Sequence, residues 1–144
     1  MSTVATPRVG TPWHVWVVAG LTLLWNGSGA VTIMLAQAGR LPGVSADEAA
    51  YYAAQPLWFV ISTDIATLAP VAAAIALLFR SQLAVWLFAV SLALIVVTNG
   101  YDLVAGTSRA QVNQSAFIVT ITIVVVATHQ LIYALAMKRR GILA

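Results

Sequence analysis

Long apolar stretches are the feature that most limits how this chain can fold. A helix needs roughly 20 apolar residues to cross the hydrocarbon core of a bilayer. Four stretches of that length, with their connections, use nearly all of the 144 residues. The sequence therefore predicts an all-α polytopic membrane protein, a single domain over residues 1–144 with four transmembrane helices in an antiparallel bundle.

Composition supports a lipid-facing surface. Only 8% of the residues are charged and 61% are hydrophobic, whereas a soluble domain carries about 25% charged residues. Cysteine is absent, which excludes disulfides, thiolate metal sites and cysteine nucleophiles. The net charge of +3 is no sign of nucleic-acid binding, because Lys138, Arg139 and Arg140 supply much of it at a helix end, where they are typical of a membrane anchor.

The four predicted spans cover about residues 13–37, 57–79, 83–101 and 116–137. The first span resembles a signal peptide, with Ala36-Gln37-Ala38 as a cleavage site, but its apolar run exceeds the core of such peptides. We therefore expect it to be a retained helix. In the first outer loop, Ser45 and Glu48 form a capping-box pattern, which predicts a short interfacial helix from Ala46 to Ala54.

Basic residues predict the orientation of the bundle. Four spans place the N-terminus, the second loop and the C-terminus on one side of the membrane. That side holds five of the seven basic residues and the other side holds two, Arg40 and Arg109. Because short cytoplasmic segments are enriched in Lys and Arg, both termini are expected in the cytoplasm.

Asp64 is the most informative polar residue, because a carboxylate within the membrane is unfavourable unless it is paired, hydrated or protonated. Matching depths across the helices predicts an intramembrane polar site that opens outward. Its members are Asp64, Asn26, Asn99, Thr67, Tyr101 and Asp102. One interpretation is a solute or proton site, which Asp64→Asn would inactivate; the other is a hydrogen-bond clasp between helices.

Small residues suggest where helices approach one another. Gly27 and Gly29 in the first span, and Ala66 and Pro70 in the second, are predicted to pack against neighbouring helices. The alternative for the glycines is a loosened helix at a binding site. Pro70 is also expected to kink its helix and to leave a carbonyl group free.

His129 and Gln130 lie in the inner half of the fourth span. His14 is the only other histidine, and it lies ~12 Å away in depth, so the two cannot ligate one haem iron. His129 is instead expected to bond a carbonyl group or Tyr133, with a pigment or proton role as the alternative. No catalytic motif is present, and we expect no enzyme activity, no metal and no cofactor.

Several short motifs resemble a family of small four-helix inner-membrane proteins common in proteobacteria. The resemblance covers most of the chain. Its motifs are Pro12-Trp13-His14-Val15-Trp16-Val17-Val18, Leu24-Trp25-Asn26 with Gly29, Pro56 with Trp58, Ala84-Val85, Phe88-Ala89-Val90-Ser91-Leu92, Val97-Thr98 with Tyr101, and Met137-Lys138-Arg139-Arg140-Gly141.

Members of that family are often labelled sugar transporters. The resemblance implies small-solute transport in the bacterial inner membrane. This chain departs from the family pattern at Thr32-Ile33, where an Asp-Tyr pair is usual. Because four helices enclose little space, transport is expected to require a homo-oligomer or a partner protein, with the outward pocket between subunits. The alternative is a non-catalytic accessory subunit of a larger membrane protein complex. The expected partners are the lipid bilayer and other protein chains, and nucleic acid is not expected.

Overall fold

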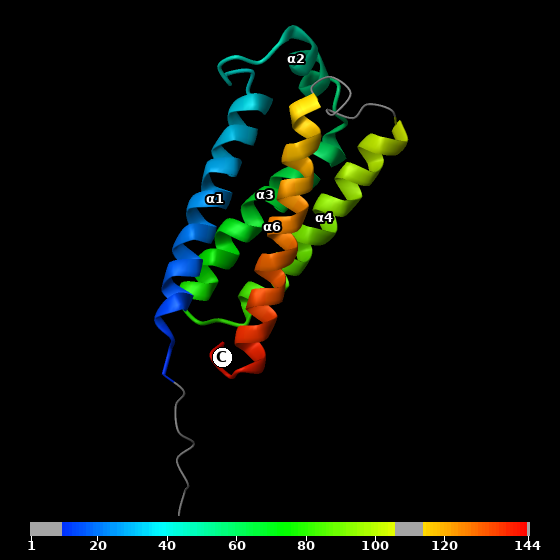
Figure 1. Ribbon diagram of the computed structural model, residues 1–144. Helices are drawn as coiled ribbons and strands as arrows, with labels where there is room; N and C mark the ends of the chain where they lie inside the picture. The colour runs from blue at the N-terminus through cyan, green and yellow to red at the C-terminus, as the bar shows by residue number, and fades with distance from the viewer. Residues whose placement is uncertain (1–9, 106–113, 144) are drawn as a thin grey trace, which may run out of the picture.

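The computed structural model describes residues 10–105 and 114–143, and this part of the chain folds into helices joined by short connections. The elements are α1 (Trp13–Gln37), α2 (Ala46–Ala53), α3 (Leu57–Leu78), α4 (Leu83–Ala105) and α6 (Gln114–Arg139). Successive long helices run in opposite directions (Figure 1). The predicted all-α antiparallel bundle is confirmed. The N-terminal lead and the connection at 106–113 lie outside the described residues.

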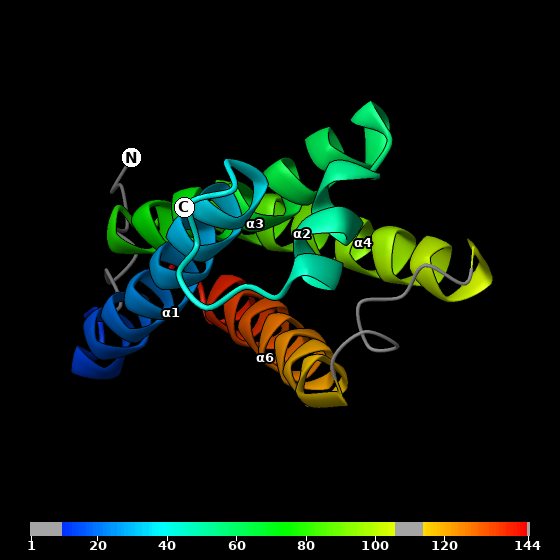
Figure 2. The same cartoon turned by 90° about the horizontal axis from the view of Figure 1, so that it is seen from above.

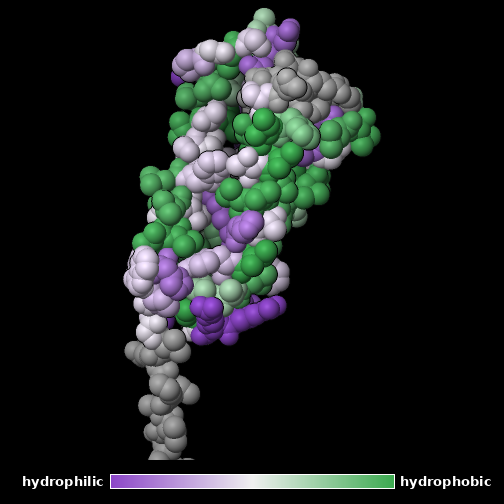
Figure 3. Space-filling view, in the orientation of Figure 1, coloured by the Kyte–Doolittle hydropathy of each residue, from purple (hydrophilic) through white to green (hydrophobic). Residues whose placement is uncertain are grey.

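Four helices, α1, α3, α4 and α6, are long and apolar enough to cross a membrane. Large hydrophobic side chains remain exposed along each of them, as Leu24 (72%) and Ile118 (67%) illustrate. On the face shown in Figure 3, hydrophobic residues flank a central band that includes a hydrophilic patch, and further hydrophilic residues lie at the two ends. The chain is therefore a multi-pass membrane protein, because a surface of this kind is stable only against lipid.

Local sequence explains where the first helices begin and end. α1 has the predicted bounds. The capping box of α2 is confirmed: the Glu48 amide donates to the Ser45 hydroxyl at 3.2 Å, and the Ser45 amide donates to the Glu48 carboxylate at 3.4 Å. Ala54 caps the C-terminal end of α2, so this helix stops one residue earlier than predicted.

The end of α4 corrects the predicted boundary. The span was expected to end at Tyr101, with Asp102 in the following connection, but the helix continues to Ala105. Hydropathy locates the membrane boundary, whereas backbone hydrogen bonds continue until a residue interrupts them. No proline occurs between Tyr101 and Gly106, so Asp102 lies on the helix itself.

The long helices pack in the order α1, α3, α4, α6. α3 packs along both α1 and α4, and α4 packs against α6, whereas within the described residues α1 and α6 form no comparable pair. Seen from above, α6 diverges from α1 toward the end of the bundle at which α2 lies (Figure 2). We call this the α2 end, and the opposite end, which holds the start of α1 and the end of α6, the terminal end.

Apolar side chains fill the terminal end. Val15, Leu77, Phe88 and Met137 belong to one buried cluster, which also includes the last described residues of the chain. The chain turns back at Gly141, whose φ of 68° suits glycine. Ile142 and Leu143 are then 1% and 3% exposed, so the basic tail is followed by an apolar plug.

A proline in α3 explains one contact between α3 and α4. Pro70 has no backbone N–H, so the carbonyl group of Ala66, four residues earlier, lacks its helical donor. Ser91 of α4 is 2% exposed, and its hydroxyl donates to that carbonyl at 2.6 Å. The predicted free carbonyl is therefore used to join two helices.

Candidate functional site: a polar cavity at the α2 end

A cavity of about 370 Å³ occupies the α2 end of the bundle. Its walls come from the second halves of α1 and α4 and the first halves of α3 and α6. The antiparallel order brings these four half-helices to the same end. Cavities that bind small molecules typically measure roughly 300–1,000 Å³, so this one is large enough for a ligand the size of a monosaccharide.

Hydroxyl and amide groups dominate the polar part of the cavity wall. The amides are Asn26, Gln37, Gln55 and Asn99, and the hydroxyls are Ser28, Thr32, Tyr51, Tyr52, Thr63, Thr67, Ser91, Thr98 and Thr120. Trp25 and Phe59 add aromatic surface. Asp102 is the one carboxylate among the described lining residues, and neither Lys nor Arg is among them. The cavity is therefore suited to neutral polar groups.

Two buried polar atoms on the wall have no hydrogen-bond partner within the described part of the protein. They are Nε2 of Gln37 on α1 and Oγ1 of Thr63 on α3. A buried polar atom without a partner destabilises the fold by about 1–3 kcal/mol. Both atoms are almost fully covered, so a ligand in the cavity would reach them only after the Gln37 or Thr63 side chain rotates toward it.

Other polar side chains on the wall bond to their own helices. Thr67 donates to the Thr63 carbonyl at 2.7 Å, Asn26 to Thr22 at 2.8 Å, and Asn99 to Ile95 at 2.7 Å. These bonds fix the side-chain positions. An amide has a second N–H and an oxygen, and a hydroxyl has acceptor lone pairs, so capacity for further bonds remains.

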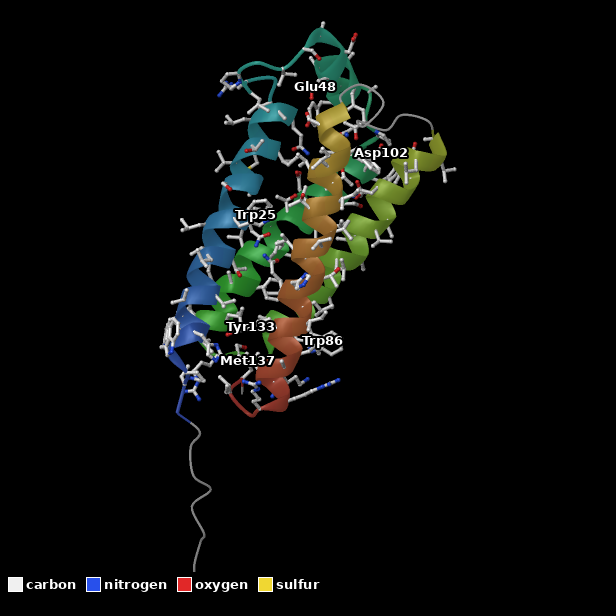
Figure 4. All side chains as sticks on the ribbon, in the orientation of Figure 1. Trp25, Glu48, Trp86, Asp102, Tyr133 and Met137 are labelled. Atoms are coloured by element: carbon white, nitrogen blue, oxygen red, sulfur yellow. The ribbon has the colours of Figure 1, made fainter. Side chains whose placement is uncertain are left out.

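Seen from above, α2 lies over one end of the bundle (Figure 2), and its Tyr51 and Tyr52 line the cavity. The Tyr51 hydroxyl donates to Oδ2 of Asp102 at 2.6 Å, which ties α2 to the end of α4. Figure 4 shows Asp102 on α4 close to α2. Burial, together with the hydrogen bond to Asp102, raises the pKa of Tyr51 well above its usual value of 10.0. Tyr51 therefore stays protonated and remains a donor at neutral pH.

The cavity brings together four of the six residues predicted to form the polar site. Asn26, Thr67, Asn99 and Asp102 line it. Tyr101 instead packs its ring against Trp58 and Phe59, with centroid distances of 4.8 and 5.8 Å.

Asp64 does not line the cavity. It follows Thr63 directly, so its side chain leaves α3 about 100° around the helix from that of Thr63. Asp64 is partly buried, and its Oδ1 has no hydrogen-bond partner in the described structure. The amides of Asn26 and Asn99, predicted as its neighbours by depth, bond to their own helices instead.

The small residues of the two helices differ in their surroundings. Ala66 and Pro70 are buried in α3 and contribute to the cavity wall. A methyl group added at Gly27 or Gly29 would meet no atom within 4 Å, so neither glycine mediates a close helix contact here. α1 also continues unbroken through both positions, and Gly29 lines the cavity.

The histidines lie along the seam between α1 and α6. Nδ1 of His129 is 2.7 Å from the Val125 carbonyl, one of the two partners expected. The other expected partner, Tyr133, has its hydroxyl 2.8 Å from Nδ1 of His14. That contact joins α1 to α6 at the terminal end. His129 and Gln130 line a second hollow along this seam, separate from the polar residues of the cavity wall.

Several cavity residues were not predicted from the sequence, including Gln37, Tyr51 and Thr32. A signal was present, because polar residues recur four positions apart at Ser28 and Thr32 and at Thr63 and Thr67. That spacing places each pair on one face of a helix. A single hydroxyl within a membrane helix is a weaker indication of a site than a carboxylate, because it can bond to its own helix. Nine hydroxyl side chains nevertheless line this cavity.

Within residues 10–105 and 114–143, no three His, Asp or Glu side chains gather as metal ligands would. No protein-family model, curated protein or solved structure matches the chain. Fold and cavity chemistry therefore characterise the protein: a multi-pass membrane protein of four candidate spans, with a hydroxyl- and amide-lined cavity at one end.

Proposed function

We propose that this protein binds a small, uncharged, hydroxyl-rich solute, such as a monosaccharide or polyol, and serves in its transport across the membrane. The observation that carries the proposal is the cavity of about 370 Å³ lined by hydroxyl and amide side chains, of which Gln37 and Thr63 each have a polar atom without a hydrogen-bond partner in the described structure. A bound hydroxyl group can accept from the amide and exchange a hydrogen bond with the threonine.

The lining supports an uncharged ligand. Asp102 is the one carboxylate among the described lining residues and also accepts from Tyr51, so most of the wall offers a cationic ligand no opposite charge. An anionic ligand would meet Asp102 and no cation among the described lining residues. Hydroxyls and amides pair with hydroxyls at no charge penalty, and Trp25 and Phe59 offer aromatic surface to the apolar faces of a sugar ring.

For orientation, we propose the bacterial inner membrane with both termini in the cytoplasm. The excess of basic residues on the terminal side supports this. The cavity then faces outward. The apolar cluster around Leu77 and Phe88 closes the inward route, so transport requires this cluster to open.

A binding cavity formed within a single chain favours a ligand-binding role over that of a purely structural accessory subunit. One chain supplies hydroxyl, amide and aromatic groups around a cavity of about 370 Å³. In this proposal the expected homo-oligomer serves the inward opening of the apolar cluster.

The test is binding and uptake with purified protein in proteoliposomes. Radiolabelled glucose, glycerol and inositol are compared with charged gluconate and glucosamine. We expect saturable binding of a neutral probe, weakened about tenfold or more by Gln37→Leu or Thr63→Val, since each removes a hydrogen bond worth ~1.5 kcal/mol. Gln82→Leu and Thr122→Val are matched controls, because both residues are exposed and outside the cavity wall.

Two results contradict the proposal. One is the absence of saturable binding for every neutral probe. The other is equal binding by the cavity variants and their matched controls. Binding without uptake would retain the cavity as a ligand site and remove the transport part of the proposal.

A further inference from the structure

The second hollow is a groove between α1 and α6 that meets the polar cavity. It measures about 730 Å³ and most of its lining surface is apolar. Trp25 of α1 and Val126 of α6 line both the groove and the cavity. Figure 4 shows Trp25 on α1 beside α6. The two hollows are therefore neighbours, separated by these two side chains.

The groove exists because the bundle is not closed. α1 and α6 do not pack along each other within the described residues, and the contact of His14 with Tyr133 joins them at the terminal end. Above that contact the seam faces the lipid. A hydrocarbon chain can enter it sideways without crossing water.

The dimensions suit an acyl chain. The groove follows α1 from His14 to Trp25, which are eleven positions apart, or ~16 Å along the helix. That length is about half the ~30 Å hydrocarbon core of a bilayer. A molecule with its head in the cavity would extend its chain from Trp25 along Leu21 and Val18.

We propose that the ligand is a glycolipid, with its uncharged sugar headgroup in the polar cavity and one acyl chain in the groove between α1 and α6. This inference rests on the proposed binding of hydroxyl-rich groups in the cavity and names the class of molecule that carries them. Each half of the molecule meets matching chemistry: hydroxyls and amides for the head, hydrocarbon for the tail.

Charge and access distinguish this occupant from the major lipids. A phospholipid would bring its phosphate toward Asp102 with no Lys or Arg among the described cavity residues to neutralise it. α2, which the bond between Tyr51 and Asp102 ties to α4, lies at the outer end of the cavity, whereas the groove between α1 and α6 gives a lateral route from the lipid. The structure thus favours a neutral head arriving through the membrane.

The experiment uses the full chain in nanodiscs with a monoglucosyl diacylglycerol that carries a photoreactive diazirine on one acyl chain. We expect labelling to concentrate on the groove segments, residues 18–25 and 125–137. Unlabelled monoglucosyl diacylglycerol should displace the probe, and phosphatidylglycerol should not. Free glucose binding is measured on the same preparations by equilibrium dialysis.

Leu21→Trp fills the groove and is expected to reduce labelling about tenfold, the effect of losing ~1.4 kcal/mol of binding, while glucose binding is unchanged. Leu24→Trp is the matched control: both leucines are exposed on α1, at 63% and 72%, and Leu24 lies outside groove and cavity. Equal thermal melting of the two variants establishes that both fold.

The outcomes separate this inference from the proposed function. Glucose binding with labelling scattered over all lipid-facing helices overturns the glycolipid and leaves the solute site. Displacement by phosphatidylglycerol, or equal loss of labelling in both leucine variants, also overturns it. Failure of glucose and glycolipid alike removes both proposals.

Discussion

The Tyr51 hydroxyl lies 2.6 Å from Asp102 Oδ2, a hydrogen bond that joins two residues 51 positions apart in the sequence. It links the short helix between the first two candidate spans to the last turns of α4. Because both residues line the cavity, this bond decides how firmly α2 covers the polar site.

Removing that bond should loosen α2. In Tyr51→Phe the ring remains but the donor is lost, and hydrogen bonds to charged groups are worth ~1.5–3 kcal/mol. We expect backbone amides of residues 46–53 to exchange with deuterium about tenfold faster, measured by mass spectrometry. In the control Tyr101→Phe, which keeps its aromatic packing, the same amides should exchange at the wild-type rate. If the α2 amides of Tyr51→Phe were as protected as those of the wild type, the bond would not hold α2.

Alkaline pH should act on the same contact. The pKa of Tyr51 is raised above 10.0 in the folded protein, first by burial and then by the bond to Asp102. Stability from the protonated hydroxyl is therefore complete below pH 10, the unfolded pKa, and declines as pH rises above it. In an ultraviolet titration of the wild-type protein, Tyr51 should be the last tyrosine to ionise, so Tyr51→Phe should lack only the step at the highest pH. If Tyr51→Phe instead lacked a step near pH 10, the raised pKa of Tyr51 would be contradicted.

Ser91→Ala should destabilise the bundle by about 1–3 kcal/mol, because the Ala66 carbonyl would be left buried without a donor. Pro70→Ala restores the backbone N–H that normally bonds this carbonyl. We therefore expect Ser91→Ala to have a smaller effect when Pro70→Ala is already present. Thermal melting in detergent of both single variants and the double variant measures this coupling. If the two single-variant losses of stability simply added up in the double variant, Pro70 and Ser91 would act independently and the prediction would be wrong.

The apolar plug that follows the basic tail should stabilise the terminal end. Ile142 is 1% exposed and belongs to the buried cluster there. Ile142→Ala should lower the free energy of unfolding by about 2–5 kcal/mol, as is usual for buried Ile or Leu replaced by Ala. Ile118→Ala, at a position 67% exposed, is the matched control. A tail that only anchors the chain at the lipid surface would give equal melting temperatures for the two variants.

Asp64→Asn should leave binding of a neutral solute within about twofold of wild type, a change of ~0.5 kcal/mol or less, because Asp64 does not line the cavity. Of the two interpretations of Asp64 drawn from the sequence, the solute or proton site predicted the opposite result. The same substitution should not lower the melting temperature, since it removes a partly buried carboxylate whose Oδ1 lacks a hydrogen-bond partner. Loss of binding in Asp64→Asn with normal folding would return Asp64 to the site.

Local features of the chain were predictable because they depend on neighbours in the sequence. Long apolar runs locate the spans, and the box formed by Ser45 and Glu48 starts α2. Pro70 predicted a carbonyl group without its helical donor, although nothing in the sequence showed that the Ser91 hydroxyl would donate to it. The end of α4 was misjudged because hydropathy declines before the helix does.

The candidate site was predictable only in part. Depth along each helix suggested that Asn26, Thr67, Asn99 and Asp102 share a level, and these four line one cavity. Depth does not give the direction in which a side chain leaves its helix. Asp64 and Thr63 are adjacent in sequence, yet they leave α3 about 100° apart, and only Thr63 faces the cavity.

By itself, the sequence determined that this protein has four apolar helices long enough to span a membrane, because burial in lipid depends on composition and length. The tertiary structure decided how these helices rotate about their axes and which pairs remain apart. Rotation turned hydroxyls and amides from four helices into one cavity, and the separation of α1 from α6 opened a groove beside it. Both outcomes depend on contacts between distant parts of the chain, which no local pattern specifies.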